Sequence, residues 1–302
     1  MAGGATWAKA LGWEEYSLLD AGSAGARNSG TEAGGERLER WGSFVVRRPD
    51  PLASAWPQDS AYEWAAPDAW CKGGAGSGTW VVRPGLTDKW VISRGQLSFR
   101  VGPSGQKQMG LFPEQAPNWD WLAGKIRSKK APVRVLNLFA YTGGATVAAA
   151  VAGASVCHVD ASQSAVALAK GNLELSNLSQ SPVRFIVDDA RKFVDREMRR
   201  ERHYDAVVMD PPTFGRGPGG ETWEICRDLQ PLIERCAALI SGSPRFMLIS
   251  FHTTGLDARG VAGMLRSCPA LSPGAIHVSE MALVSKSGKT LNCGVTVTWE
   301  AR

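Results

Sequence analysis

Apolar runs alternate with helix-like segments along the second half of the chain. From residue 131 onward, short hydrophobic runs end in polar turns and are followed by stretches whose apolar positions recur at helical spacing. This repetition predicts a doubly wound α/β fold, with a mostly parallel, seven-stranded sheet covered by helices on both faces. We expect strands at residues 133–139, 155–160, 183–187, 204–209 and 246–251, helices at 145–152, 163–176, 190–201, 223–240 and 260–265, and a terminal hairpin of 277–285 with 290–300.

The first part of the chain has a different pattern. Alternating segments at residues 79–83, 90–93 and 97–101 are typical of β-strands, and residues 21–35, rich in Gly, Ala and Ser, predict a flexible loop between strands. We therefore expect a smaller, β-rich N-terminal domain on the substrate side at residues 1–125, and a ligand-binding α/β domain at residues 126–302.

Composition narrows the class of protein. The 302 residues are 44% hydrophobic, and Lys plus Arg exceed Asp plus Glu by 34 to 29, which permits a nucleic-acid partner without requiring one. Six scattered cysteines show no paired ligand spacing, so we expect reduced thiols and no metal site. The chain has neither a long apolar stretch nor a signal peptide, so we expect no membrane association and a cytoplasmic location, with an organelle matrix as the alternative.

Two motifs at strand ends suggest a nucleoside-binding site. The first strand runs into a helix through Asn137-Leu-Phe-Ala-Tyr-Thr-Gly-Gly144, where glycine lets the backbone approach a ligand, although a plain strand-to-helix turn would also use glycine. Asp160 ends the second strand, 23 residues after Asn137, where a carboxylate accepts hydrogen bonds from two ribose hydroxyls. The alternative for Asp160 is a role at the start of the following helix.

Asp188 and Asp189 end the third strand. One carboxylate is expected to accept a hydrogen bond from an adenine amine while the other caps the next helix. We favour Asp189 for the ligand, because the small Ala190 beside it leaves room for a flat base.

The fourth strand ends in Asp210-Pro-Pro-Thr-Phe214, the most specific motif of the chain. The two prolines stop the strand and restrict Asp210 to extended geometry at the edge where open α/β sheets bind ligands. Asp210 and the Pro211 carbonyl could hold a planar acceptor nitrogen, with Phe214 stacking on its ring. The alternative is a rigid turn with a core phenylalanine.

These motifs together resemble the class I S-adenosylmethionine-dependent methyltransferases, and most closely the branch of the bacterial large-subunit ribosomal-RNA methyltransferases. The segment Lys107–Gln115, followed by Asn118-Trp-Asp-Trp121, resembles that branch's approach loop, which packs over the methionine end of the cofactor. The resemblance implies a Rossmann-like methyltransferase domain that binds S-adenosylmethionine, with cofactor-binding roles for Gln115, Asn137, Phe139, Tyr141, Thr142, Gly143, Gly144, Asp160, Asp188, Asp189 and Asp210, and catalytic roles for Asp210, Pro211, Pro212 and Phe214.

One departure from that branch limits the chemistry. Its cytosine-C5 enzymes carry a nucleophilic cysteine after the fifth strand or after the two prolines, where this chain has Ser250-Phe-His-Thr-Thr-Gly255 and Thr213. Direct in-line transfer to a nitrogen or an oxygen therefore fits better. We expect a nitrogen of an RNA base as the acceptor, with protein or small-molecule acceptors as alternatives. His252 is a second candidate base, although a lone histidine at a strand end is more often structural.

Two features each leave two interpretations open. Arg216, in the Gly-rich loop at residues 215–220, would bind an anion or lie on a mobile surface loop. Trp119, Trp121 and Trp223 would stack bases or pack in the core.

Two other functions compete with methyl transfer. The first is a nicotinamide oxidoreductase, but this chain lacks the Gly-x-Gly-x-x-Gly turn that such an enzyme needs. The second is an RNA-binding module that retains only the fold.

Overall fold

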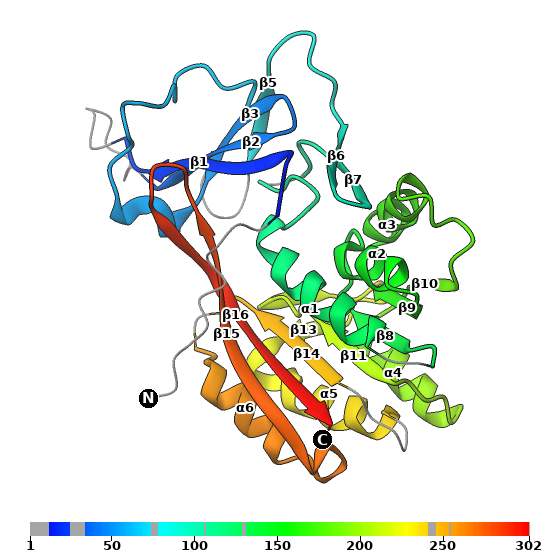
Figure 1. Ribbon diagram of the computed structural model, residues 1–302. Coiled ribbons are helices and arrows are strands. Elements are labelled where there is room, and N and C mark those ends of the chain that lie inside the picture. Colours follow the sequence, from blue (N-terminus) through cyan, green and yellow to red (C-terminus); the bar gives the residue numbers. More distant parts are fainter. Residues whose placement is uncertain are drawn as a thin grey trace. The chain divides into compact units, whose positions relative to one another are not determined.

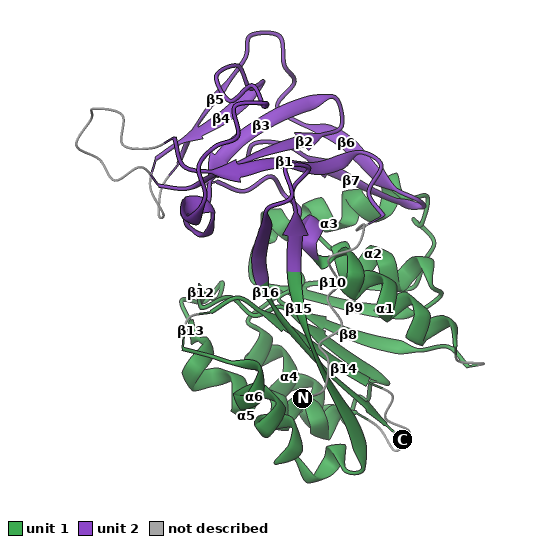
Figure 2. Cartoon of the chain, turned by 60° about the vertical axis from the view of Figure 1, so that its left-hand side comes forward, with its two compact units in different colours: residues 1–6, 115–281, 294–302 green, residues 7–114, 282–293 purple. Residues whose placement is uncertain are grey.

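The computed structural model describes residues 12–24, 34–73, 78–105, 107–128, 131–240, 246–253 and 255–301. Most of the loop predicted at residues 21–35 lies outside the described residues. The chain divides into two compact units, which Figure 2 shows in different colours. Among the described residues, unit 1 comprises 115–281 and 294–301, and unit 2 comprises 12–114 and 282–293.

The sheet of unit 1 contains β8 (Arg134–Leu138), β9 (Ser155–Asp160), β10 (Val183–Val187), β11 (Ala206–Met209), β14 (Phe246–Phe251), β15 (Gly274–Val284) and β16 (Thr290–Ala301). Their order across the sheet is β10-β9-β8-β11-β14-β16-β15. The first five run parallel, and β16 pairs antiparallel with β14. The mostly parallel, seven-stranded sheet predicted from the sequence is therefore confirmed.

The helices of unit 1 are α1 (Ala116–Arg127), α2 (Gly144–Val151), α3 (Gln163–Leu175), α4 (Ala190–Arg199), α5 (Ile225–Leu239) and α6 (Ala258–Arg266). They lie on both faces of the sheet (Figure 1). One buried cluster joins the sheet to α4, α5 and α6 through residues such as Phe193 and Leu229, and a second joins it to α1 and α2 through Leu122 and Ala149. These two apolar layers confirm the doubly wound arrangement.

Within the described residues, no helix is both long and apolar enough to cross a membrane.

Most elements predicted for unit 1 are present, and the differences lie mainly at their ends. Strands β9, β10 and β14 have the predicted bounds. The helix predicted at residues 223–240 begins at Ile225, because Trp223 belongs to β13 (Thr222–Glu224), which pairs with β12 (Phe214–Arg216). Pairing with a neighbouring segment outweighs the helical pattern there.

Helix α1 is the main element that the sequence pattern does not predict. Its stretch contains Pro117 and two tryptophans, which favour a loop in a sequence-based interpretation. Pro117 nevertheless lies in the first turn, where the amide that proline lacks would have no partner within the helix. The helix is stabilised by burial of Leu122 and Ile126 against the sheet.

Unit 2 has the predicted β-rich character. Its main sheet has the order β1 (Tyr16–Gly22), β2 (Glu36–Trp41), β3 (Phe44–Pro49), β4 (Ala69–Lys72) and β5 (Thr79–Val82), and β6 (Trp90–Arg94) pairs with β7 (Leu97–Val101). In its core, the buried Glu39 carboxylate accepts hydrogen bonds from Arg48 at 2.6 Å and from the Tyr16 hydroxyl at 2.9 Å. The turn between β15 and β16 belongs to this unit, where Lys289 pairs with buried Asp20 at 2.7 Å.

Candidate active site at the carboxyl edge of the sheet

The polar motifs of the sequence lie where the parallel strands of unit 1 end. Residues 139–144 follow β8, Asp160 ends β9, Asp188 follows β10 and Asp210 follows β11. Because these strands are parallel, their carboxyl ends lie at one edge of the sheet. This edge is the usual ligand-binding region of open α/β sheets.

The loop after β8 has a strained backbone that Asp160 holds in place. Phe139 and Tyr141 have φ angles of 53° and 47°, which side-chain-bearing residues rarely adopt. The Asp160 carboxylate accepts from the backbone N–H of Tyr141 and from that of Ser162, each at 2.8 Å. Burial raises the pKa of Asp160 above its usual value. One carboxylate therefore fixes both the loop and the chain that leads into α3.

Close packing explains why both of these positions in the loop are glycine. A Cβ atom on Gly144 would lie 2.4 Å from the ring of Trp119, and one on Gly143 would lie 2.9 Å from Ala169. Gly143 also has a φ of 87°. Close packing of helices against the loop thus accounts for both residues. Their contact with a ligand stays a prediction.

Buried polar groups support the loop from beneath. Asn137 donates to the Thr146 hydroxyl at 2.9 Å, which lies 2.9 Å from Nδ1 of His158. Burial lowers the pKa of His158 to about 3, so the imidazole is neutral near pH 7. The Thr142 carbonyl accepts from Asn172 at 2.9 Å. Asn137 and Thr142 are thus buried contributors to the shape of the loop.

Of the two carboxylates after β10, Asp189 is the one that caps the next helix, the role that we expected for Asp188. Asp189 is the N-cap of α4, accepting from the backbone N–H groups of Arg191 and Lys192 at 2.9 and 3.1 Å. Its side chain is buried, so the capping role belongs to Asp189, and its expected contact with the ligand stays a prediction. Asp188 is less buried and pairs with Arg196 at 2.6 Å, so it is the better candidate for the ligand.

Asp210 lies in a chain of directed hydrogen bonds. Ser250, at the end of β14, donates its hydroxyl to Oδ1 at 2.7 Å, and the Gln115 amide donates to Oδ2 at 3.0 Å. The same Gln115 nitrogen donates to the Ser250 hydroxyl at 3.0 Å. Gln115, predicted to contact the cofactor, therefore also orients Asp210. Both carboxylate oxygens of Asp210 thus accept hydrogen bonds from side chains.

Asn118 fixes the orientation of the Gln115 amide. Its nitrogen donates to the Gln115 carbonyl oxygen at 2.7 Å, so the amide nitrogen of Gln115 must face Asp210. Asn118 is itself held by Thr296 in β16, whose hydroxyl donates to the Asn118 carbonyl at 3.0 Å. Asn118 and Thr296 are buried. A polar chain thus runs from β16 through α1 to Asp210.

Phe214 is exposed at the start of the β12–β13 hairpin, which we call the acceptor hairpin (residues 214–224). Its side chain is 70% exposed, so it is not the core residue of the alternative interpretation. Pro211 is buried, whereas the Pro212 carbonyl accepts from the indole N–H of Trp223 at 2.7 Å. The Trp223 ring lies 4.7 Å from that of Phe139. The two prolines and Trp223 thereby hold an aromatic ring at the edge of the sheet.

The remaining candidates have differing surroundings. Arg216 and His252 are both exposed. Trp119 and Trp223 are buried, and partly buried Trp121 packs edge-on against Phe246. The tryptophans thus follow the core-packing alternative.

Two residues of this site had no role assigned from the sequence. Ser250 contacts Asp210 directly, and Asn118, placed in the approach loop by resemblance alone, contacts Gln115. Ser250 appears in the sequence only as the position without a cysteine, although a hydroxyl at the end of an apolar strand was a usable signal. Asn118 lies 178 residues from its partner Thr296, so no local pattern reveals their contact.

Comparisons with known proteins agree with this architecture. A family model described as S-adenosylmethionine-dependent methyltransferase matches residues 67–257, more than half of the 302-residue chain. The solved structure of a SAM-dependent methyltransferase from Agrobacterium tumefaciens is similar with a TM-score of 0.87 and 30% identity, covering 96% of this chain and 92% of that one.

Curated relatives match shorter regions. Ribosomal RNA large subunit methyltransferase I of Enterobacter is 36% identical over 124 residues, which are 41% of this chain and 31% of the relative. Ribosomal RNA large subunit methyltransferase K/L of Syntrophotalea carbinolica is 34% identical over 156 residues, 51% of this chain and 21% of the relative. The matched regions thus span less than a third of these relatives' own length.

Proposed function

Because this chain belongs to the S-adenosylmethionine-dependent methyltransferase family, we propose that it transfers the methyl group to a nitrogen of an RNA base, with ribosomal RNA as the favoured substrate. The main observation in support is the Asp210 carboxylate, which Gln115 and Ser250 fix in place and which the exposed Phe214 follows four residues later in the chain. The names of the curated relatives favour large-subunit ribosomal RNA.

The residues at the carboxyl edge fit S-adenosylmethionine. Asp160 is a partly buried carboxylate whose oxygens each accept one backbone N–H. A carboxylate has about four acceptor positions, so Asp160 has capacity for the ribose hydroxyls. We assign the adenine amine to Asp188, and the methionine end to Gln115 and the loop at residues 139–144.

The cofactor supplies an activated methyl group on a sulfonium that is its own leaving group, so the protein's task is alignment and exclusion of water. Asp210 orients the acceptor nitrogen by accepting its N–H, because an ionised carboxylate can only accept. It can take up the proton once the nitrogen has reacted. Phe214 offers a face on which the base stacks.

The same site argues against covalent catalysis on a pyrimidine carbon. Residues 250–255, where that branch carries the cysteine after the fifth strand, contain no cysteine; their serine, Ser250, is 1% exposed, and its hydroxyl donates to Asp210. A buried hydroxyl is poorly placed to attack a base ring, and a hydroxyl is a weaker nucleophile than a cysteine thiolate. Transfer to a nitrogen needs no such group.

The test is methyl transfer from labelled S-adenosylmethionine to large-subunit RNA extracted from cells that lack this protein. We expect the label to be released by ribonuclease as one N-methylated nucleoside. Protease-sensitive label would indicate a protein acceptor, and label on carbon 5 of a pyrimidine would contradict the nitrogen assignment. No transfer to RNA, protein or small-molecule fractions would favour an RNA-binding module.

A further inference from the structure

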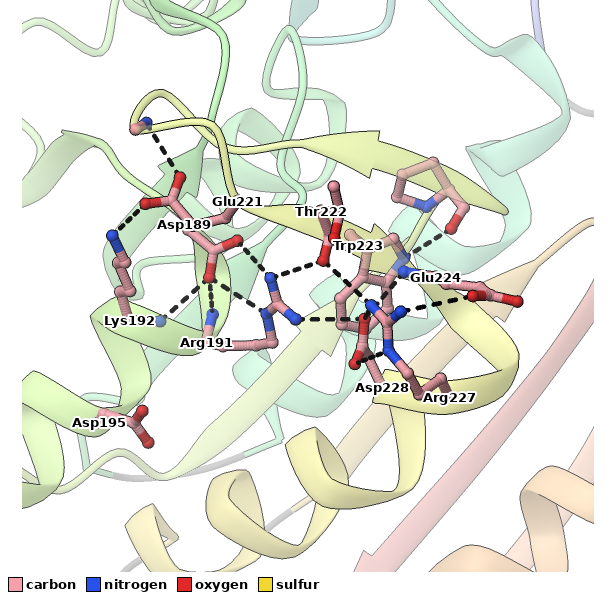
Figure 3. A network of polar contacts seen from close by, with 12 residues as sticks. Asp189, Arg191, Lys192, Asp195, Glu221, Thr222, Trp223, Glu224, Arg227 and Asp228 are labelled. Carbon is pink, nitrogen blue, oxygen red and sulfur yellow. Dashed lines mark hydrogen bonds and ion pairs between the residues drawn. The ribbon is translucent and has the colours of Figure 1, made fainter.

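One arginine at the start of α4 contacts three elements of unit 1 (Figure 3). Nε and Nη2 of Arg191 lie 3.3 and 3.2 Å from the two carboxylate oxygens of Asp189. Nη2 also donates to the Thr222 carbonyl in β13 at 2.9 Å, and Nη1 lies 3.2 Å from Asp228 in α5. A guanidinium can join three partners because its five N–H donors form a rigid fork.

The same guanidinium adjoins the residue that holds the acceptor hairpin. It lies 5.8 Å from the ring centre of Trp223, within cation–π range. Trp223 in turn donates to Pro212 and contacts Phe139 of the loop after β8. Within the hairpin, Phe214 pairs with Glu224, directly after Trp223. A shift of Arg191 would therefore be transmitted to the ring of Phe214.

Neighbouring charges provide a comparison. Arg235 and Asp195 also join α5 to α4, at 3.3 Å. In Figure 3, Asp195 lies apart from the network of contacts around Arg191. The side chains of Arg235 and Asp195 are about 40% exposed, whereas the Arg191 side chain is 23% exposed. The Arg191 contacts are thus less screened by water.

We propose that Arg191 is a positioning residue that ties the acceptor hairpin to the cofactor edge of the site. Asp189, its partner, directly follows Asp188, to which we assign the adenine amine. Occupation of the cofactor edge would therefore order the hairpin through Arg191 and place Phe214 for the acceptor base. The ordering of the hairpin rests on the cofactor assignment of the proposed function, but it does not depend on the identity of the methyl acceptor.

The experiment measures hydrogen exchange of the backbone amides at residues 213–224 in the full chain, with and without S-adenosylhomocysteine. In the wild type we expect the ligand to slow exchange by at least about threefold. Arg191→Gln should raise exchange of the free protein about tenfold, as loss of charged hydrogen bonds predicts, and should abolish the effect of the ligand. Arg235→Gln, the matched control, should behave as the wild type.

Arg191→Lys is a second, milder variant that keeps the proposal testable if Arg191→Gln does not fold. Lysine keeps the charge but loses the planar fork, so we expect the hairpin to loosen while S-adenosylhomocysteine binds within about threefold of the wild-type affinity. An unchanged ligand effect in both Arg191 variants would overturn the proposal, as would equal loosening in Arg235→Gln. Since no acceptor is used, a wrong RNA assignment would leave this result unaffected.

Discussion

The two halves of the site hold their carboxylates in different ways. On the cofactor side, Asp160 and Asp189 accept hydrogen bonds from backbone N–H groups, most of them two or three residues away along the chain, and Asp189 also accepts from the nearby Arg191 side chain. On the acceptor side, Asp210 accepts from the side chains of Gln115 and Ser250, which lie 95 and 40 residues away.

The shape of the cofactor side therefore depends on the backbone, whereas the orientation of Asp210 depends on other side chains. Backbone amides belong to the fold itself, so the cofactor side is formed wherever the loop and helix starts are formed. A side-chain amide can rotate, so Asp210 depends on further groups, such as Asn118, that keep Gln115 in one orientation. We therefore expect substitutions on the cofactor side to alter binding, and those on the acceptor side to alter turnover.

The largest expected effect is on turnover. Asp210→Ala should lower kcat by about 10²- to 10⁴-fold, because the acceptor nitrogen loses its hydrogen-bond and proton acceptor. Asp210→Asn keeps the shape and should lose nearly as much. Steady-state methyl transfer to RNA measures both, with thermal melting as the control for folding. Turnover near the wild-type rate in Asp210→Ala would mean that the acceptor lies elsewhere.

A substitution on the cofactor side should act through packing. Gly144→Ala forces a Cβ to within 2.4 Å of Trp119 and should lower the free energy of unfolding by about 1 to 3 kcal/mol. Gly171→Ala is the matched control, since its Cβ meets nothing within 4 Å in α3, and it should stabilise the protein by about 0.5 to 1 kcal/mol. Urea unfolding compares them, and equal changes would refute the packing argument.

The long-range support of the acceptor side predicts a smaller effect. Asn118→Leu removes the donor that orients Gln115 and should lower kcat about fivefold to tenfold, as expected for one lost hydrogen bond. The affinity for S-adenosylmethionine should change much less. Gln230→Leu, which removes an exposed amide on α5, serves as the control. A fall in cofactor affinity without a fall in kcat would place Asn118 on the cofactor side.

The smallest expected effect is a pH dependence of cofactor binding. Burial raises the pKa of Asp160, so its carboxylate takes up a proton at a higher pH than an ordinary aspartate does. Protonation removes an acceptor from the ribose site, so affinity should fall as the pH is lowered from about 7 to about 4. Calorimetry on the wild type and Asp160→Asn checks this, because the asparagine variant should lack this component of the pH dependence.

The same contrast explains what the sequence could predict. Strand periodicity predicted β9 and β10 with the right ends, and strand ends predicted where Asp160 and Asp210 lie. These features depend on local pattern and on the rule that parallel strands share an edge.

Other features depend on contacts that no local pattern contains. Helix α1 is stabilised by its burial against the sheet, and the partners of Asp210 come from distant parts of the chain. The choice between Asp188 and Asp189 depended on which carboxylate reached the first amides of α4, and the sequence could not decide it.

The most direct test of the division between the two sides is calorimetric titration of S-adenosylmethionine into Asp160→Ala and Asp210→Ala side by side. The account predicts that Asp160→Ala weakens binding by about 1 to 3 kcal/mol, the cost of an unpaired polar contact, while Asp210→Ala binds nearly as the wild type does. Unchanged affinity in Asp160→Ala, or an equal loss in both variants, would contradict it.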